Sequence, residues 1–529
     1  MSAFQGKTIK FLGKDPNPAA VEVLVKLLAN PDNRLRTMAF DALFLRKDQT
    51  LCILLFKYFI KDEEFWAHNE ILTAERLSRL ADAAFRTDNA AVREEAARVI
   101  LQYKLYETLP AVLMYLEGSD DELAVKAKAM TLQLSESFYA DLLAAPESER
   151  RNFDRRREWF VQQLDGPIKR YSVNNCEELI KSLLILAKKD YETMVTLAAD
   201  HRSVAGKKVI EELSTGEHGS YIRLLLSYIG DSGTPALIDE ILVKRSDPLF
   251  VRKMLETVGP EPTFEFKTAL KRFKEFAWFF PNKAELPSLV DGLEPFAVQL
   301  LSASDFPKDR QIKLHRFFLE RKPAESRRAA AEAVRRLVGD DVNSMLLDFL
   351  NDSDPVTAAT IFRILKARNC KEIDQHFDTL VNRPEPEIRQ AIYDTMPDLH
   401  IESFASRFNQ LTAESARIQG RYVRLIDPNT LKIISDDIVS PIPIRRLSAC
   451  GVAAATGYAR DFEKRIIEMA AGDDEGKVRI AAITALGSIL TKDSIEEIKY
   501  LINDRSMDIR NAAAAALRDW MTAYQAQAK

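Results

Sequence analysis

Hydrophobic side chains recur along most of the chain at intervals of three and four residues, the spacing that lines one face of an α-helix. The clearest example carries this stripe at Val342, Met345, Leu346, Phe349 and Leu350. It ends at residues 351–355, Asn-Asp-Ser-Asp-Pro, whose residue types favour a turn. Few segments show the strict alternation of polar and apolar residues that is typical of a half-buried strand. The pattern therefore predicts helices joined by short turns.

Local signals mark where individual helices begin. Ser494 and Glu497 have the spacing of a capping box, which predicts a helix start at Ser494. Thr234 precedes a proline, as a cap residue does when the proline occupies the first helical turn. Residues 421–434 leave two interpretations open, because they are compatible either with a helix or with a short β-hairpin.

A repeated arrangement of residues is clearest near the C-terminal end of the sequence. Two copies there share an acidic turn, an aliphatic residue, an arginine and then small residues at helical spacing. The aliphatic–arginine pairs are Val478–Arg479 and Ile509–Arg510, roughly thirty residues apart. Small residues on one helical face allow a second helix to approach closely. The pattern therefore predicts that each copy forms a helical hairpin that packs against its neighbour.

The same frame recurs upstream at intervals of about thirty residues or near multiples of that distance. Its aliphatic–basic pairs, or their degenerate equivalents, are Leu35–Arg36, Val92–Arg93, Val125–Lys126, Ile222–Arg223, Val251–Arg252, Ser326–Arg327, Val356–Thr357, Ile388–Arg389 and Ile444–Arg445. A hairpin of this length cannot bury its own apolar face, so neighbouring hairpins must stack. The sequence predicts an all-α fold, a right-handed α-solenoid (superhelix) of about sixteen stacked helical hairpins.

The acidic turn, the aliphatic–arginine pair and the alanine-rich second helix resemble HEAT repeats, including the variety found in phycobilisome lyases. The resemblance covers residues 320–520 best, and residues 20–135 and 215–260 less closely. In that family the arginine near the start of the second helix commonly joins an aspartate of an adjacent repeat, forming a ladder along the solenoid. The resemblance implies this structural role for Arg36, Arg93, Arg389, Arg479 and Arg510. Thr357 departs from the pattern, and we expect the ladder to be interrupted there.

Two irregular segments suggest a division of the chain into four parts. Residues 1–136 are expected to form N-terminal HEAT-like repeats, and residues 137–214 a degenerate helical segment. Residues 215–310 are expected to hold central repeats with a proline- and aromatic-rich irregularity, since frequent prolines shorten helices. Residues 311–529 are expected to form C-terminal HEAT-like repeats. The aromatic cluster at residues 273–280 is either a core wedge or an exposed partner anchor.

Composition narrows the classes of function. The 75 basic and 79 acidic residues give a formal charge of −4, which disfavours nucleic acid as a partner. The four cysteines lie far apart without CxxC spacing, so reduced thiols are expected instead of disulfides or a zinc site. No apolar run is long enough for a membrane span, and the first residues lack the apolar stretch of a secretory signal. A cytoplasmic location is expected.

The sequence contains no recognisable catalytic constellation. The histidines never pair at metal-ligand spacing, and neither HExxH nor GxSxG occurs. No cofactor, no metal and no catalytic residue is predicted, and the protein is not expected to be an enzyme.

Two basic segments are the candidate partner-binding sites. The first combines arginines with an aromatic residue, a composition suited to an acidic partner surface or to phosphate: Arg150, Arg151, Arg155, Arg156, Arg157 and Trp159. The second contains Arg327 and Arg328. Interspersed acidic residues in the first segment also fit the alternative, an ordinary solvated helix face.

These features predict a non-catalytic scaffold or adaptor that binds protein partners, of unidentified nature, on the curved surface of an α-solenoid. One alternative, implied by the resemblance, is a chromophore-lyase-like enzyme or lyase subunit. Another alternative is a nucleic-acid-binding HEAT-like protein that uses the basic segments, against which the net acidity counts.

Overall fold

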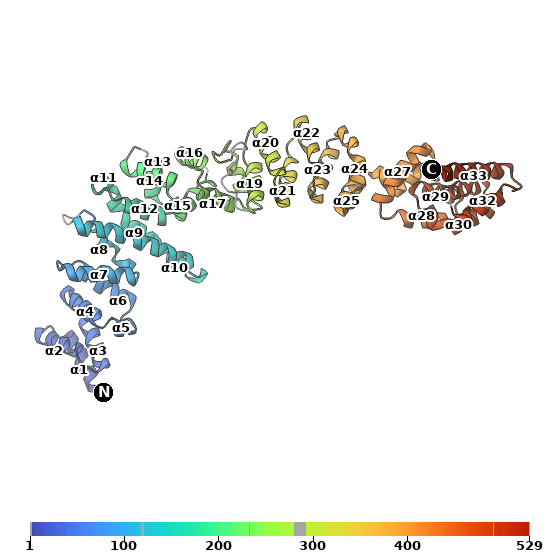
Figure 1. The fold of residues 1–529 in the computed structure, drawn as a ribbon. Helices are drawn as coiled ribbons and strands as arrows, with labels where there is room; N and C mark the ends of the chain where they lie inside the picture. The colour runs from blue at the N-terminus through green and yellow to red at the C-terminus, as the bar shows by residue number, and fades with distance from the viewer. Residues whose placement is uncertain are drawn as a thin grey trace. The chain divides into compact units, whose positions relative to one another are not determined.

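The computed structural model describes residues 3–117, 121–200, 202–231, 233–279, 292–489 and 491–527. Helices account for 75% of the structure, and the described residues contain no strand. The predicted all-α solenoid class is therefore confirmed. The chain divides into two units, the first comprising residues 1–290 and 303–305 and the second residues 291–302 and 306–529. Within each unit the helices follow one another in chain order (Figure 1).

The first unit is built from α1 to α18 and one 3₁₀ helix. Their bounds are α1 (Ala3–Lys14), α2 (Pro18–Leu28), α3 (Asn33–Phe44), α4 (Gln49–Lys61), α5 (Glu63–Ala67), α6 (Ala74–Phe85), α7 (Ala90–Gln102), η1 (Tyr106–Thr108), α8 (Leu109–Leu113), α9 (Asp121–Ala144), α10 (Glu147–Lys169), α11 (Tyr171–Asn174), α12 (Glu177–Leu186), α13 (Glu192–Ala199), α14 (Val204–Thr215), α15 (Gly219–Ser227), α16 (Ala236–Lys244), α17 (Pro248–Val258) and α18 (Phe264–Leu270).

The second unit is built from α19 to α33 and four 3₁₀ helices. Their bounds are α19 (Glu294–Ala303), α20 (Lys308–Leu319), α21 (Ala324–Val334), α22 (Asp340–Asp348), α23 (Pro355–Ala367), η2 (Lys371–Gln375), α24 (Phe377–Val381), α25 (Pro386–Thr395), η3 (Pro397–Leu399), α26 (Ile401–Arg407), η4 (Phe408–Gln410), α27 (Ala413–Ile426), α28 (Thr430–Ile438), α29 (Pro443–Thr456), η5 (Ala459–Phe462), α30 (Glu463–Gly472), α31 (Gly476–Leu486), α32 (Lys492–Leu501) and α33 (Met507–Gln527).

The hairpin of α30 and α31 shows how the sequence pattern becomes a stack. Ile466 on α30 and Val478, Ile483 and Leu486 on α31 are at most 1% exposed. Full burial of each such aliphatic side chain contributes roughly 1.5–3 kcal/mol relative to leaving it in water. The two helices of one hairpin shield only part of this surface, so α31 also packs against α29 and α33.

The same serial contact runs through the second unit. Each second helix of a hairpin contacts the second helix of the next one, in the order α21, α23, α25, α27, α29, α31 and α33. In the first unit, α14 contacts α16 while α15 contacts α17, so first helices and second helices form separate layers there too. Neighbour-to-neighbour packing of this kind is the property that defines a solenoid.

Two longer helices interrupt the regular hairpin length in the first unit. α9 has 24 residues and α10 has 23, and α9 packs along α12. Pro167 lies inside α10, where its missing N–H and its ring weaken the last turns, and the helix ends two residues later at Lys169. α10 lies within residues 137–214, the segment expected to be degenerate, and α9 reaches into it with its C-terminal third.

The structure decides between the two interpretations that the sequence left open for residues 421–434. This segment forms the end of α27 and the start of α28, so the β-hairpin alternative is wrong. Thr430 begins α28, and its hydroxyl donates to the carbonyls of Asp427 and Val423, which closes the turn between the helices.

Both predicted cap positions are wrong in detail. Thr491 caps α32, and Ser494 is the third helical residue, whose hydroxyl accepts from the backbone N–H of Thr491. The capping box is therefore present but begins three residues earlier. The Thr234 hydroxyl donates to the carbonyls of Tyr228 and Asp231, and α16 starts only at Ala236.

The aromatic cluster that follows α18 lies in the core. Phe273, Phe276, Trp278 and Phe279 are at most 2% exposed, and successive ring centroids lie 4.9–6.0 Å apart. The interpretation as a core wedge is therefore correct for these four residues, and Phe280 falls outside the described residues. An Ala277 N–H···O bond to Val243 of 2.7 Å anchors the segment to α16.

Candidate functional site

The first candidate surface is the arginine-rich beginning of α10. Arg150, Arg151 and Arg155 are exposed, and none of them forms an ion pair with another described residue. Phe153 lies on the opposite side of this helical turn, where its ring packs 5.8 Å from that of Phe138 on α9. The helix thus anchors itself through its aromatic side and presents guanidinium groups to solvent.

The remaining residues of this segment face the protein. An Nη2 atom of Arg156 lies 2.6 Å from the Glu107 carboxylate, and its guanidinium lies over the ring of Tyr106. Arg157 donates through Nε to the carbonyl of Leu186 at the end of α12, and burial lowers the pKa of its guanidinium. Trp159 is half-buried. The structure therefore divides the predicted segment into three solvent-facing arginines, two arginines that hold α10 in place and the half-buried Trp159.

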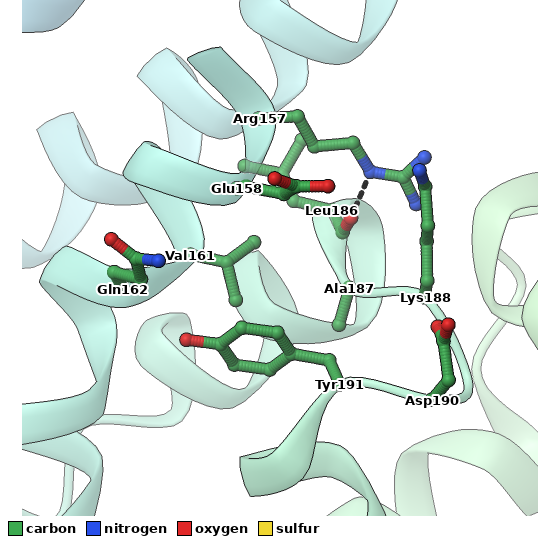
Figure 2. Close-up of a pocket in the computed structure, with 9 residues that line it drawn as sticks. All are labelled: Arg157, Glu158, Val161, Gln162, Leu186, Ala187, Lys188, Asp190 and Tyr191. Carbon is green, nitrogen blue, oxygen red and sulfur yellow. Dashed lines mark hydrogen bonds between the residues drawn. The ribbon is translucent and has the colours of Figure 1, made fainter. Parts of the chain in front are cut away.

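A recess of about 240 Å³ lies between α10 and the turn that joins α12 to α13 (Figure 2). It is lined by Arg157, Glu158, Val161, Gln162, Leu186, Ala187, Lys188, Asp190 and Tyr191. The hydroxyl of Tyr191 donates to Asp165 at 2.7 Å, and burial together with this bond raises the pKa of Tyr191. Lys188 pairs with Asp154 at 3.1 Å. These groups connect α10 to the α12–α13 turn, and a tyrosine kept protonated in this way is suited to positioning and not to proton abstraction.

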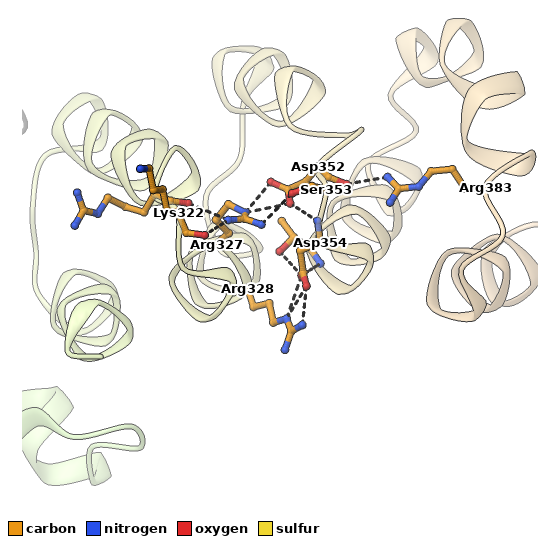
Figure 3. Close-up of polar contacts among 9 residues, drawn as sticks. Lys322, Arg327, Arg328, Asp352, Ser353, Asp354 and Arg383 are labelled. Atoms are coloured by element: carbon orange, nitrogen blue, oxygen red, sulfur yellow. Dashed lines mark hydrogen bonds and ion pairs between the residues drawn. The ribbon is translucent and has the colours of Figure 1, made fainter. Parts of the chain in front are cut away.

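The second candidate segment lies in an ion-pair network between consecutive hairpins (Figure 3). Arg327 on α21 pairs with Asp352 at 3.0 Å, and both side chains are about one-tenth exposed, at 11% and 8%. Arg328 pairs with Asp354 at 2.6 Å. Arg383, after α24, donates to the carbonyl of Asp352 at 2.8 Å. Because its guanidinium is enclosed, we assign Arg327 to the inter-repeat ladder instead of to partner binding.

Asp354 makes two kinds of contact in this network, a helix cap and an ion pair. It is the N-cap of α23, accepting from the backbone N–H and the hydroxyl of Thr357 at 2.8 Å each. It also accepts from Arg328 of the preceding hairpin. The Arg328 guanidinium, with help from the cap bonds, lowers the pKa of Asp354 to about 2. The carboxylate therefore links the start of one helix to the helix before it.

The ladder arginines occupy one helical position, the fourth residue of the second helix. Arg36, Arg327, Arg446 and Arg479 pair there with an aspartate 25–27 residues further on. Three of these pairs are well enclosed, with Arg446–Asp473 and Arg479–Asp504 at 2.8 and 2.6 Å and every side chain at most 17% exposed. The Arg36–Asp62 pair at 2.7 Å is more open on the aspartate side.

A second contact of these arginines has no counterpart in the predicted pattern. Arg327, Arg389, Arg446 and Arg510 each donate to the backbone carbonyl six residues earlier. Those carbonyls follow the end of the hairpin's first helix, where they lack helical partners. The arginine therefore fixes the turn of its own hairpin as well as the next repeat. A basic residue eight or nine positions after the end of the hairpin's first helix is the sequence signal for this contact.

The predicted frame is one residue out of register in four repeats, where the predicted residue is the fifth of α15 and α17 or the third of α23 and α29. In α9 it is two residues out, because Lys126 is the sixth residue. In α29 the ladder residue is Arg446, whereas Arg445 is exposed and lies 3.7 Å from Asp437. In α23 the fourth residue is the buried Ala358, so the departure from the arginine pattern lies there and not at Thr357. Sequence spacing alone does not decide between adjacent residues, because the helix start depends on which side chain caps it.

The remaining predicted ladder residues keep their position but differ in their contacts. Arg389 donates to the carbonyl of Arg383, and Arg510 to the carbonyls of Asp504 and Arg505. Arg93 is half-buried at the fourth position of α7. The aspartate-pairing role that the resemblance implies for these three residues remains a proposal.

Groups of three or more histidine, cysteine, aspartate or glutamate side chains able to hold a metal ion are absent from the described residues. The four cysteines are buried and unpaired. Burial raises the pKa of the Cys176 and Cys450 thiols to about 12. Among the helices that the structure describes, none combines the length and apolar character needed to cross a membrane.

Stacked hairpins tied by arginine–aspartate pairs define the architecture as an α-solenoid. A family model described as HEAT repeats matches residues 463–528, which hold α30 to α33. The predicted resemblance is therefore confirmed for this segment. No curated protein matches the sequence.

Solved structures with similar helical repeats share little sequence with this chain. A chain in a homology model of the full-length AP-3 complex is 11% identical, with 97% of this chain and 93% of that chain covered and a TM-score of 0.36. A chain from work on a phosphorylation switch in the interaction between cadherin and beta-catenin is 12% identical, with coverages of 95% and 99% and a TM-score of 0.30. Kap121p bound to Pho4p is 10% identical, with coverages of 98% and 54% and a TM-score of 0.23. This chain thus spans about half the length of Kap121p, and the similarity concerns helical architecture alone.

Proposed function

We propose that this protein is a non-catalytic scaffold that binds one or more protein partners on the exposed faces of its helical repeats. The proposal rests on the observation that the arginines fall into two groups, one enclosed between repeats and one exposed to solvent. Enclosed ones such as Arg327, Arg446 and Arg479 join neighbouring repeats, whereas Arg150, Arg151 and Arg155 on α10 project into solvent without an ion-pair partner among the described residues.

An acidic partner surface suits the exposed side of α10. Guanidinium groups bind carboxylates through paired, charge-assisted hydrogen bonds, and arginine is enriched where protein surfaces meet. The half-buried Trp159 adds an amphipathic ring next to this side. Buried, unpaired cysteines agree with a reducing compartment, which supports the cytoplasm as the location we propose.

Affinity purification of the full chain under mild conditions tests the proposal. We expect a co-purifying protein in fixed stoichiometry, with its recovery falling several-fold for the triple variant Arg150→Ser, Arg151→Ser, Arg155→Ser. A matched control removes the same charge from exposed lysines elsewhere, as Lys432→Ser, Lys477→Ser, Lys499→Ser. Recovery of the bait alone contradicts the scaffold proposal, and equal recovery with both triple variants contradicts the assignment of α10.

A further inference from the structure

A second arginine-lined surface lies between α27 and α29, away from the segments that the sequence singled out. A groove of about 650 Å³ there includes Arg417, Arg421 and Arg424 of α27 and Ala454 and Ala455 of α29. The three arginines are spaced by four and three residues, so they share one helical face, and all three are exposed. This surface is called the arginine groove below.

Three positive charges line the arginine groove, and Asp378 is the one acidic residue among its lining residues. None of its three arginines forms an ion pair with any carboxylate of the described residues, whereas Arg363 on nearby α23 pairs with Asp394 at 3.0 Å. Arg421 donates to the side-chain oxygen of Asn382 at 2.9 Å, and Arg424 to the carbonyl of Gly457 at 3.2 Å. A guanidinium has five N–H donors, so most of the donors remain available. Like charges one turn apart also destabilise a helix, which leaves an anionic ligand as the natural counterpart.

The small residues Ala454 and Ala455 of α29 line the arginine groove, where α27 and α29 approach each other closely. Gly420 allows this, because a Cβ atom at that position would lie 2.5 Å from the carbonyl oxygen of Ala455. α29 ends at Thr456, and the following Gly457 adopts the left-handed conformation with φ of +76°, which stops the helix at this end of the groove. Ile418, 43% exposed, adds an apolar side chain beside the arginines.

We propose that the arginine groove binds an acidic segment of a partner protein, with its carboxylates on Arg417 and Arg421 and an apolar side chain against Ile418 and Ala454. This inference rests on the proposed scaffold function and names the chemistry of one partner segment. Charge complementarity supports it, since bidentate guanidinium–carboxylate pairs combine specificity with strength.

The aromatic rings near the groove favour a peptide over a single-stranded nucleic acid. Base stacking needs a free ring face. The ring of Tyr422 instead packs edge-on against Phe377 at 5.2 Å, and its hydroxyl donates to Asp378. The ring of Tyr458 is covered by the guanidinium of Arg424 at 4.5 Å.

Fluorescence polarisation with the full chain tests the proposal. The probe is a short fluorescein-labelled peptide that is rich in glutamate and carries a leucine, and the control peptide replaces every glutamate by glutamine. We expect the acidic peptide to bind, and the double variant Arg417→Gln, Arg421→Gln to weaken binding by about tenfold or more, since two charge-assisted contacts are lost. The control variant Arg335→Gln, Arg465→Gln removes the same amount of charge elsewhere, from side chains that are 58% and 44% exposed. It should bind the acidic peptide as the native protein does.

Each other outcome overturns the inference. Failure of the native chain to bind the acidic peptide, or equal weakening by both double variants, excludes a specific site. Competition by oligothymidine at equal or lower concentration than unlabelled peptide identifies a nucleic-acid site instead. Recovery of a partner in the affinity purification, with no peptide binding here, refutes the arginine groove while leaving the scaffold function intact.

Discussion

Arginine residues on α27 and α29 have three different surroundings in this protein. Arg446 is enclosed with Asp473 between two repeats, its neighbour Arg445 is exposed, and Arg421 faces a groove without a carboxylate partner. The difference comes from helical phase, because adjacent residues on a helix point about 100° apart. Whether an arginine stabilises the fold or is available to a ligand is therefore decided by its position within the helix and not by its immediate sequence neighbours.

Asp354 offers a direct measure of what a carboxylate that joins two neighbouring repeats contributes. Its pKa is lowered to about 2 by Arg328 and the cap bonds, below the ordinary value of 3.8. A carboxylate with a lowered folded-state pKa adds stability above its unfolded pKa and loses it as the pH falls through the folded one. The variant Asp354→Asn keeps a side chain that can cap α23 but removes the charge.

We expect Asp354→Asn to be less stable than the native protein at pH 7, by at most about 2 kcal/mol. The difference should shrink as the pH falls from about 4 to about 2, because the native carboxylate becomes neutral in that window. Urea unfolding followed by circular dichroism at several pH values measures this. A difference that stays constant down to pH 2 would show that the charge of Asp354 is not the cause.

At the scale of the helix, glycine sets how closely two second helices approach. Gly420 is buried against the end of α29, and an added Cβ would meet backbone atoms of Ala455 that have no freedom to move aside. We expect Gly420→Ala to separate α27 from α29 and to destabilise the protein by roughly 1–3 kcal/mol, the usual cost of overpacking.

Gly476→Ala is the matched control for this prediction. A Cβ at Gly476, the first residue of α31, would have no atom within 4 Å. The better helix propensity of alanine should therefore leave stability unchanged or slightly raised. Thermal unfolding of both variants is the measurement, and equal melting temperatures would mean that the α27–α29 contact is looser than its geometry implies.

At the scale of the molecule, stability is distributed between neighbours instead of being held in one central core. Each hairpin of the second unit is bound to the ones before and after it through helix stacking and, at several junctions, through an arginine–aspartate pair. Such local contacts let parts of a solenoid fold independently when both ends of the part are protected.

A fragment of residues 291–529 should therefore fold by itself. We expect a helical circular dichroism spectrum, a cooperative unfolding transition and peptide binding in the arginine groove equal to that of the full chain. A fragment that is unfolded, or that unfolds without cooperativity, would show that this unit depends on the rest of the chain.

The sequence by itself determined the repeating helices and their class of fold. The intervals of three and four between apolar residues predict helices, and a recurrence of about thirty residues predicts stacking, because a single hairpin leaves its apolar face exposed. The positions of Arg36 and Arg479 in the ladder also follow from this recurrence together with the family resemblance. These features depend on the spacing of residues within one helix or on a regular recurrence along the chain, and both can be seen in the sequence itself.

Only the tertiary structure decided which arginine side chains form ion pairs within the protein and which remain available to a ligand. It moved the ladder residue from Arg445 to Arg446, enclosed Arg327 between repeats, and brought the arginines of α27 next to the small residues of α29. The physical reason is that exposure and ion pairing depend on neighbours some 25–40 residues away, whose approach is fixed by caps and packing at each turn. A shift of one residue at a helix start rotates every side chain after it, and no pattern within one hairpin reveals that shift.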